Sequence, residues 1–210
     1  AVAVGDMVCA DVPVRELMND CFTCRGLDDR TGAFVVLEAA REAAGQGASM
    51  GIYAATTTGE ETTGRGAYHA AARLKPDCCI AVDVTWASDA PGTNPNDTGE
   101  VKLGGGPVLC MGSAVNKPMN ALLKKVAEEL EMKVQWEIAG SRTGTDGDTV
   151  NRAHEGIPMA LISIPLRYMH SSVEVGSWKD IQDCIRLLSA FVVRLSEEMD
   201  KGFDFCPVRP

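Results

Sequence analysis

Short apolar runs alternate with helix-like segments along most of this chain, and this alternation restricts the fold more than any other feature. Runs that predict strands lie at 50–58, 78–83, 133–138 and 159–164. Segments that predict helices, from composition or from apolar residues at helical spacing, lie at 32–44, 66–74, 118–130, 145–154 and 177–199. The pattern predicts an α/β fold in which a mixed, mostly parallel sheet is flanked by helices on both faces.

The segments between and before these elements also carry signals. Residues 88–106 are rich in Gly, Pro, Asn and Asp, which is typical of a loop. Ser177 and Asp180 are spaced like a capping box, with Asp in place of Glu, and predict the start of the last helix. Residues 2–11 resemble a strand.

The composition argues against several classes of partner. A chain of 210 residues is long enough for one sizeable domain with its own core. The net charge is −9 and no cluster of Lys and Arg occurs, so we expect no nucleic-acid partner. No apolar run reaches the length of a membrane span, so we expect no membrane partner. The surplus carboxylates suit bound cations.

Eight cysteines raise the question of a disulfide framework or a zinc site. Disulfide frameworks belong to small, loop-rich secreted domains, which this chain does not resemble. Cys21 and Cys24 have the spacing of half a zinc site, but no second pair with matching spacing follows. We therefore interpret most of the cysteines as reduced and structural, and expect a cytoplasmic protein.

Acidic and imidazole side chains follow the predicted strands. Glu60 and Glu61 follow the run at 50–58, Asp83 ends the run at 78–83, and His170 comes soon after the run at 159–164. Asp28 stands just before the first clear helix. Sites in α/β sheets form beyond the carboxyl ends of the strands, so we expect these side chains to meet at one edge.

Carboxylates and imidazole together are a ligand set for zinc, cobalt or manganese. Two such ions that share a carboxylate polarise a carbonyl and produce hydroxide near neutral pH, with a nearby carboxylate as general base. Neighbouring side chains in an extended segment point in different directions, so one of Glu60 and Glu61 can bind metal while the other faces water. The same geometry disfavours a glycosidase, whose two carboxyl groups must face each other across one bond.

Each signal has a simpler explanation when taken alone. A Glu pair in a loop is usually a solvated turn, and Asp28 and Asp29 could cap the helix that follows them. A single His after a strand is more often structural than a ligand. The joint appearance of these residues at one edge of one predicted sheet is what favours a site.

Five motifs occur in one order along nearly the whole chain, from about Gly5 to the last helix. They are LDDRTG at 27–32, GEETTGRGA at 59–67, AVDVT at 81–85, GTD at 144–146 and IPLRYMHSSVE at 164–174. Together they resemble the TET-type dinuclear metal aminopeptidases, a family also labelled cellulase M or glutamyl aminopeptidase. The resemblance implies a zinc-peptidase-like α/β fold and two divalent metal ions, zinc or cobalt.

The resemblance also implies a role for each matching residue. Asp28 is expected to bridge the two metals. Glu61 and His170 are expected to bind one of them, and Asp83 the other. Glu60 is expected to be the general base that accepts a proton from a metal-activated water.

Further residues are expected to support this set. Asp29 is expected to follow Asp28 across a cis peptide that orients the Asp28 side chain. Thr145 and Asp146 match a loop near the substrate in the family. The chain departs from the family pattern at Gly26, Gly59 and Ser172, none of which removes a ligand.

One family ligand has no counterpart in this chain. The family has a further His, in a His-x-Asp segment far ahead of the position of Asp28, and none of the 27 residues before Asp28 is His. His69 and His154 lie in helix-like stretches and are expected to be structural or solvated. We expect residues 1–15 to be the remnant of an upstream β domain with its connector, and residues 16–210 to be the catalytic α/β domain.

The resemblance implies an aminopeptidase that hydrolyses the N-terminal residue of short peptides and forms a homo-oligomer when full-length. The missing ligand leaves open a truncated, non-catalytic metal-binding or assembly module. The family label also suggests a β-glucanase, which the geometry of the carboxylates disfavours.

Overall fold

The computed structural model describes residues 1–207. Its main sheet has four strands in the order β3-β6-β4-β5. They are β3 (Cys79–Trp86), β6 (Met159–Leu166), β4 (Val108–Gly112) and β5 (Gln135–Ala139). β3 runs parallel to β6 and β4 runs parallel to β5, while β4 and β6 are antiparallel. The sheet is therefore mixed, as the sequence predicted.

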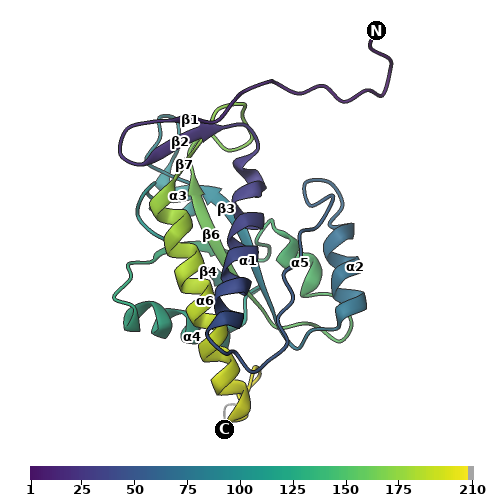
Figure 1. The fold of residues 1–210 in the computed structure, drawn as a ribbon, viewed down its shortest axis with the longest axis vertical. Coiled ribbons are helices and arrows are strands. Elements are labelled where there is room, and N and C mark those ends of the chain that lie inside the picture. The colour runs from purple at the N-terminus through teal and green to yellow at the C-terminus, as the bar shows by residue number, and fades with distance from the viewer. Residues whose placement is uncertain (208–210) are drawn as a thin grey trace.

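Helices cover both faces of this sheet (Figure 1). On one face α1 (Leu27–Gly45) and α6 (Trp178–Asp200) lie side by side, with α4 (Lys117–Glu129) beside α6. On the other face lie α2 (Arg65–Leu74) and α5 (Asp146–Val150). A single turn, α3 (Pro95–Thr98), lies within the predicted loop at 88–106.

The side chains of the fully buried strand β6 explain why helices cover both faces. Ile162 and Ile164 join the large apolar core that includes α1, α4 and α6. Met159 and Leu161 point to the opposite face and join a smaller core with Cys110. Because successive side chains of a strand point to opposite faces, a continuous apolar run needs cover on both sides.

A small antiparallel sheet packs beside the start of α1 and was not predicted. Its strands are β1 (Arg15–Glu16), β2 (Cys21–Cys24) and β7 (Glu174–Ser177), in the order β1-β2-β7. β7 follows the motif that carries His170 and pairs with β2, which leads into α1. This pairing brings the segments around residues 28 and 170 together.

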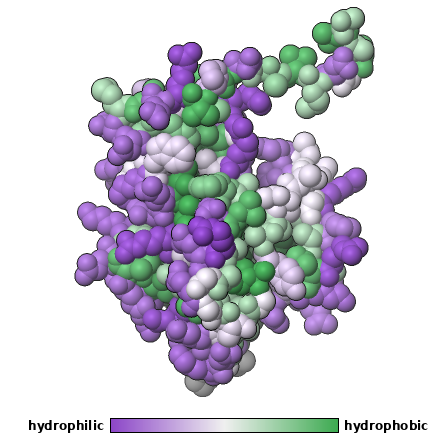
Figure 2. All heavy atoms as spheres, viewed as in Figure 1, coloured by the Kyte–Doolittle hydropathy of each residue, from purple (hydrophilic) through white to green (hydrophobic). Residues whose placement is uncertain are grey.

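Two strand predictions are wrong. Residues 50–58 form no strand, and residues 50–57 make no backbone–backbone hydrogen bond within the described chain. A cavity of about 590 Å³ is lined both by these residues and by β3, and no strand of the described chain pairs with them. Residues 2–11 also form no strand, and Figure 2 shows their hydrophobic side chains standing clear of the body.

The predicted start of α6 is confirmed, because Ser177 is its N-cap residue, but the predicted capping box is absent. Ser177 makes no side-chain cap hydrogen bond. Asp180 instead accepts hydrogen bonds from the backbone N–H groups of Gly104 (2.7 Å) and Gly106 (2.8 Å). Asp180 is fully buried and fixes the end of the long loop to the helix.

Two further observations concern the whole of the described chain. All eight cysteines are free in the described structure. Among residues 1–207, no helix combines the length and the apolar character that crossing a bilayer requires.

Candidate metal centre

Asp28 is held at the start of α1 by a buried carboxylate from β7. Oε2 of Glu174 accepts hydrogen bonds from the backbone N–H groups of Leu27 (2.5 Å) and Asp28 (3.4 Å). Gly26, just before the helix, has a φ of 67°, a conformation that glycine adopts without strain. The peptide between Asp28 and Asp29 is cis, as expected. Glu174 therefore holds the backbone at Asp28.

The Asp28 carboxylate lies beside the side chains of Glu61 and His170. Nε2 of His170 lies 3.0 Å from Oδ2 of Asp28 and 3.6 Å from Oε2 of Glu61. One ligand atom from each of the three residues lies within 4.8 Å of the others. Two carboxylates and an imidazole at this spacing fit one divalent transition-metal ion.

His170 is oriented by its backbone and by an aromatic neighbour. Its φ of 62° places it in the left-handed region, which is uncommon for a residue with a side chain. Its N–H donates to Oε1 of Glu174 at 3.1 Å. The ring meets that of Trp86 edge to face, with centroids 5.8 Å apart. These contacts hold the imidazole at the mouth of the site.

Asp83 lies near the cluster formed by Asp28, Glu61 and His170, called the three-residue cluster below, but is not part of it. Its Oδ1 accepts a hydrogen bond from the N–H of Val84 at 2.8 Å. Burial, together with the charges of Glu60, Asp28 and Asp146, raises the pKa of Asp83 to about 7. Among residues 1–207, Asp83 forms no ion pair with a cationic side chain.

The neighbouring carboxyl groups are perturbed in the same direction. Burial and then the charge of Glu61 raise the pKa of Asp28 to about 6. Burial and then the charge of Asp146 raise the pKa of Glu60 to about 7. Burial and then the charge of Asp83 raise the pKa of Asp29 to about 9. Divalent cations would relieve this crowding, so the donor set fits the expected metals.

Asp29 serves the start of the helix and does not enter the three-residue cluster. Its Oδ1 accepts a hydrogen bond from the N–H of Gly32 at 2.8 Å. A Cβ at position 32 would lie 2.1 Å from Oδ2 of Asp29, so a larger residue there would displace the Asp29 carboxylate. The expected supporting role of Asp29 is compatible with this position.

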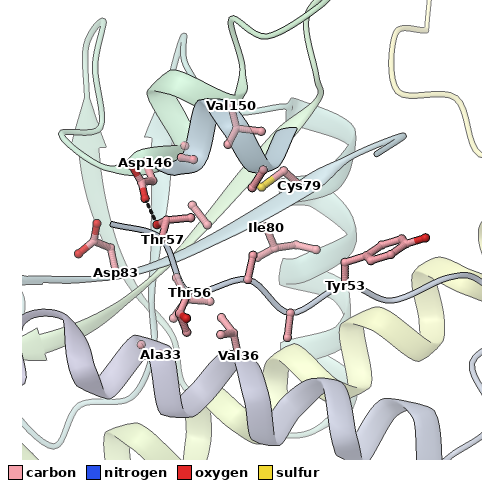
Figure 3. Close-up of a pocket in the computed structure, with 18 of the residues that line it drawn as sticks. Ala33, Val36, Tyr53, Thr56, Thr57, Cys79, Ile80, Asp83, Asp146 and Val150 are labelled. Atoms are coloured by element: carbon pink, nitrogen blue, oxygen red, sulfur yellow. Dashed lines mark hydrogen bonds between the residues drawn. The ribbon is translucent and has the colours of Figure 1, made fainter. Parts of the chain in front are cut away.

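The expected supporting residues from the 144–146 motif lie at the start of α5. The hydroxyl of Thr145 caps α5 by accepting from the N–H of Gly147 at 3.1 Å. Figure 3 shows the Asp146 carboxylate pointing to the hydroxyl of Thr57, which donates a hydrogen bond to it. Oδ1 of Asp146 is buried and has no hydrogen-bond partner within the described chain. Asp146 thereby links α5 to the segment that leads to Glu60.

A cavity of about 390 Å³ unites the site. It is lined by all five residues that the sequence brought forward as catalytic or metal-binding: Asp28, Glu60, Glu61, Asp83 and His170. Its remaining wall includes Thr85, Glu137, Arg142 and Ser163. The size suits a small ligand such as an amino acid or a short peptide end.

The two other histidines lie outside this cavity. A ring nitrogen of His154 lies 3.2 Å from the carbonyl oxygen of Ala71, and His69 is exposed on α2. Sequence reasoning gave no role to Glu174, although it lies in the motif at 164–174. Its place four residues after His170 in that motif is the sequence signal that could have indicated it.

Comparisons with known proteins give related sequences and structures. A family model described as M42 glutamyl aminopeptidase matches residues 1–187. The lysyl aminopeptidase of Pyrococcus furiosus is 37% identical over 183 residues, which cover 86% of this chain and 49% of that protein. The chain thus spans about half the length of such relatives.

Solved structures give the same result. The TET aminopeptidase of Thaumarchaeota archaeon SCGC AB-539-E09 matches with a TM-score of 0.82 and 32% identity, over 92% of this chain and 55% of that chain. The TET1 peptidase of Pyrococcus horikoshii matches with a TM-score of 0.73 and 25% identity, over 87% and 53%. That peptidase is described as assembling into a tetrahedron or a large octahedral shell.

Proposed function

Since the chain belongs to the M42 glutamyl aminopeptidase family, we propose that it carries the catalytic part of a metal-dependent aminopeptidase. The substrates are short peptides, which lose their N-terminal residue. One observation carries the proposal. The ligand atoms of Asp28, Glu61 and His170 lie within 4.8 Å of one another, in a cavity that Glu60 and Asp83 also line.

Two divalent ions, zinc or cobalt, are the proposed cofactors. Asp28, Glu61 and His170 would hold one ion, and Asp83 together with Asp28 would contribute to the other. Such a pair polarises the scissile carbonyl and lowers the pKa of water when it is bound.

Glu60 has the position and the environment of a general base. It borders the cavity, and its raised pKa of about 7 suits proton transfer near neutral pH. In the proposed reaction, the Glu60 carboxylate accepts a proton as the oxygen of water bonds to the carbonyl carbon. The peptide C–N bond then breaks, and Glu60 returns the proton to the leaving amine.

The test is a side-by-side assay of aminoacyl p-nitroanilides and cellulose, with a metal count per chain. Hydrolysis of the anilides that disappears on chelation and returns with zinc or cobalt supports the proposal. Hydrolysis of cellulose alone would favour the β-glucanase alternative. Metal binding with no hydrolysis would favour the non-catalytic module.

That second candidate has a specific observation behind it. Asp83 lies outside the three-residue cluster, so the ion nearest to it has fewer ligands in this chain. A metal-binding or assembly module needs only the ion that Asp28, Glu61 and His170 would hold. The same assay separates the two, because only the aminopeptidase turns substrate over.

Assembly and location are further proposals. The shell described for the Pyrococcus horikoshii TET1 peptidase favours a homo-oligomer for the full-length protein. The eight free cysteines are consistent with a cytoplasmic protein. We retain the division into a connector at 1–15 and a catalytic domain at 16–210.

A further inference from the structure

A carboxylate that the metal centre does not use lies in the wall of the same cavity. Glu137 comes from β5, and its side chain reaches across the sheet. Its Oε2 accepts a hydrogen bond from the hydroxyl of Thr85 on β3 at 2.5 Å. Its Oε1 accepts one from the hydroxyl of Ser163 on β6 at 2.7 Å. Two strands therefore fix the position of this carboxylate.

The register of the sheet puts Glu137 on the same face as Asp83. Ser163 is the parallel partner of Asp83, and paired residues of neighbouring strands point to the same face. Thr85 follows Asp83 by two residues and shares that face as well. Residues two apart on a strand are separated by about 6.6 Å. The carboxylate that Thr85 holds is therefore about one extended lysine side chain away from Asp83.

The Glu137 carboxylate has no cationic partner among residues 1–207, where no ion pair to it occurs. Burial raises its pKa, and the Thr85 and Ser163 hydroxyls only partly offset this effect. Each carboxylate oxygen has two lone pairs, so one on each oxygen stays available after the two hydroxyl bonds. A cation entering the cavity would find an acceptor that is already oriented and poorly solvated.

We infer that Glu137 recognises the side chain of the substrate's N-terminal residue and favours one that ends in a cation, lysine or arginine. The inference rests on the proposed aminopeptidase function, which places the amine and the scissile carbonyl at the metal centre. The N-terminal side chain then runs along the sheet face towards Thr85 and Ser163. Its ammonium or guanidinium group meets the Glu137 carboxylate.

Arg142 is the competing determinant in this cavity. It lies on the loop after β5 and would favour an acidic N-terminal residue. Arg142 is exposed, whereas Glu137 is partly buried and held by two hydroxyls. A charge that is withdrawn from water and preorganised discriminates more strongly than a solvated one. The structure therefore favours Glu137 as the specificity determinant.

The experiment compares kcat/KM for the p-nitroanilides of L-lysine, L-norleucine and L-glutamate. Lysine and norleucine have side chains of similar length and differ at the terminal ammonium. We expect the parent chain with zinc or cobalt to prefer the lysyl over the norleucyl substrate by about 10- to 100-fold. This comparison needs no variant, and a ratio of one or below would overturn the inference.

The variant Glu137→Gln keeps the shape of the side chain and removes its charge. We expect it to lower kcat/KM for the lysyl substrate by about tenfold or more and to leave the norleucyl value within about twofold. Arg142→Gln serves as the matched control and should leave the lysyl preference unchanged. The inference is wrong if Arg142→Gln abolishes a glutamyl preference and Glu137→Gln changes nothing.

The two proposals fail in different ways. If no anilide is hydrolysed under any metal condition, the proposed function fails. Binding of L-lysinamide and L-norleucinamide, followed by NMR, then tests Glu137 independently of turnover. Tighter binding of lysinamide that Glu137→Gln removes would support the inference, and equal binding or none would overturn it.

Discussion

Oε1 of the buried Glu174 accepts a hydrogen bond of 3.1 Å from the backbone N–H of His170. Its other oxygen accepts from the N–H groups of Leu27 and Asp28. One carboxylate therefore fixes two proposed ligands that are far apart in the sequence. Groups that orient metal ligands in this way contribute to affinity without touching the metal.

Replacement of this carboxylate should weaken metal binding. We expect Glu174→Gln to lower the affinity for zinc by about 10- to 100-fold, because the amide nitrogen opposes one of the backbone donors. The measurement is a competitive titration with a chromophoric chelator. Glu155→Gln, at an exposed position, is the matched control. Equal affinities of parent and Glu174→Gln would show that Glu174 does not position the ligands.

The proposed division between Glu60 and Glu61 gives a prediction with two readouts. Glu60→Gln should retain bound metal, because all proposed ligands remain. It should lower kcat by about 10²-fold or more, because the general base is lost. Glu61→Gln should lose metal, because Glu61 belongs to the three-residue cluster. Elemental analysis and anilide hydrolysis on both variants check this. Turnover by Glu60→Gln at the parent rate would remove Glu60 from the mechanism.

Metal binding should stabilise the fold through Asp28. An ion that binds only the folded chain adds about 2.7 kcal/mol when its concentration is 100 times Kd. We expect zinc to raise the Tm of the parent chain, EDTA to reverse the change, and Asp28→Asn to show little response. The check is thermal unfolding followed by circular dichroism. An equal shift in Asp28→Asn would place the ion elsewhere.

Asp180 gives a pH dependence that is separate from the metal centre. Burial raises its pKa from 3.8 to about 6, although the N–H groups of Gly104 and Gly106 oppose the change. Lys179 lowers this pKa and Asp183 raises it, both by smaller amounts. The folded chain therefore holds the proton more tightly than the unfolded chain. The contribution of Asp180 to stability is full below about pH 4 and is lost as the pH rises through about 6.

This loss has an upper limit of about 3 kcal/mol, from 1.36 kcal/mol for each pKa unit. We expect Asp180→Asn to be less stable than the parent at pH 4, because an amide NH2 group takes the place of one of the two side-chain oxygens that accept hydrogen bonds from Gly104 and Gly106. Its deficit should then shrink as the pH approaches 7. Urea unfolding from pH 4 to 7 measures the difference between the two chains. Curves that stay parallel would show that Asp180 does not titrate in this window.

The sequence predicted the parts of this fold that depend on local patterns. The run at 159–164 gave the buried strand β6, and the apolar positions after Pro118 gave α4. The presence of Asp83 and His170 in one cavity followed from the rule that sites form at the carboxyl ends of parallel strands. These predictions did not depend on contacts between residues that are far apart in the sequence.

The parts that it missed depend on contacts between segments that are far apart. Glu174 acts on a backbone N–H 147 positions earlier, and no periodicity records such a pairing. Residues 50–58 have the composition of a strand, but residues 50–57 line a cavity together with β3 and pair with no strand of the described chain. Asp180 has the spacing of a cap but binds a loop that ends 74 positions earlier. Each depends on tertiary placement.

β3 is one of the two edge strands of the main sheet, and along its free side lies the cavity that residues 50–57 also line. A row of unpaired backbone groups on an edge strand is a template for a strand from another molecule. Self-association of this chain through β3 should therefore depend on protein concentration. If chains pair through β3, the kinetic and unfolding measurements proposed above describe the monomer only at protein concentrations too low for this pairing.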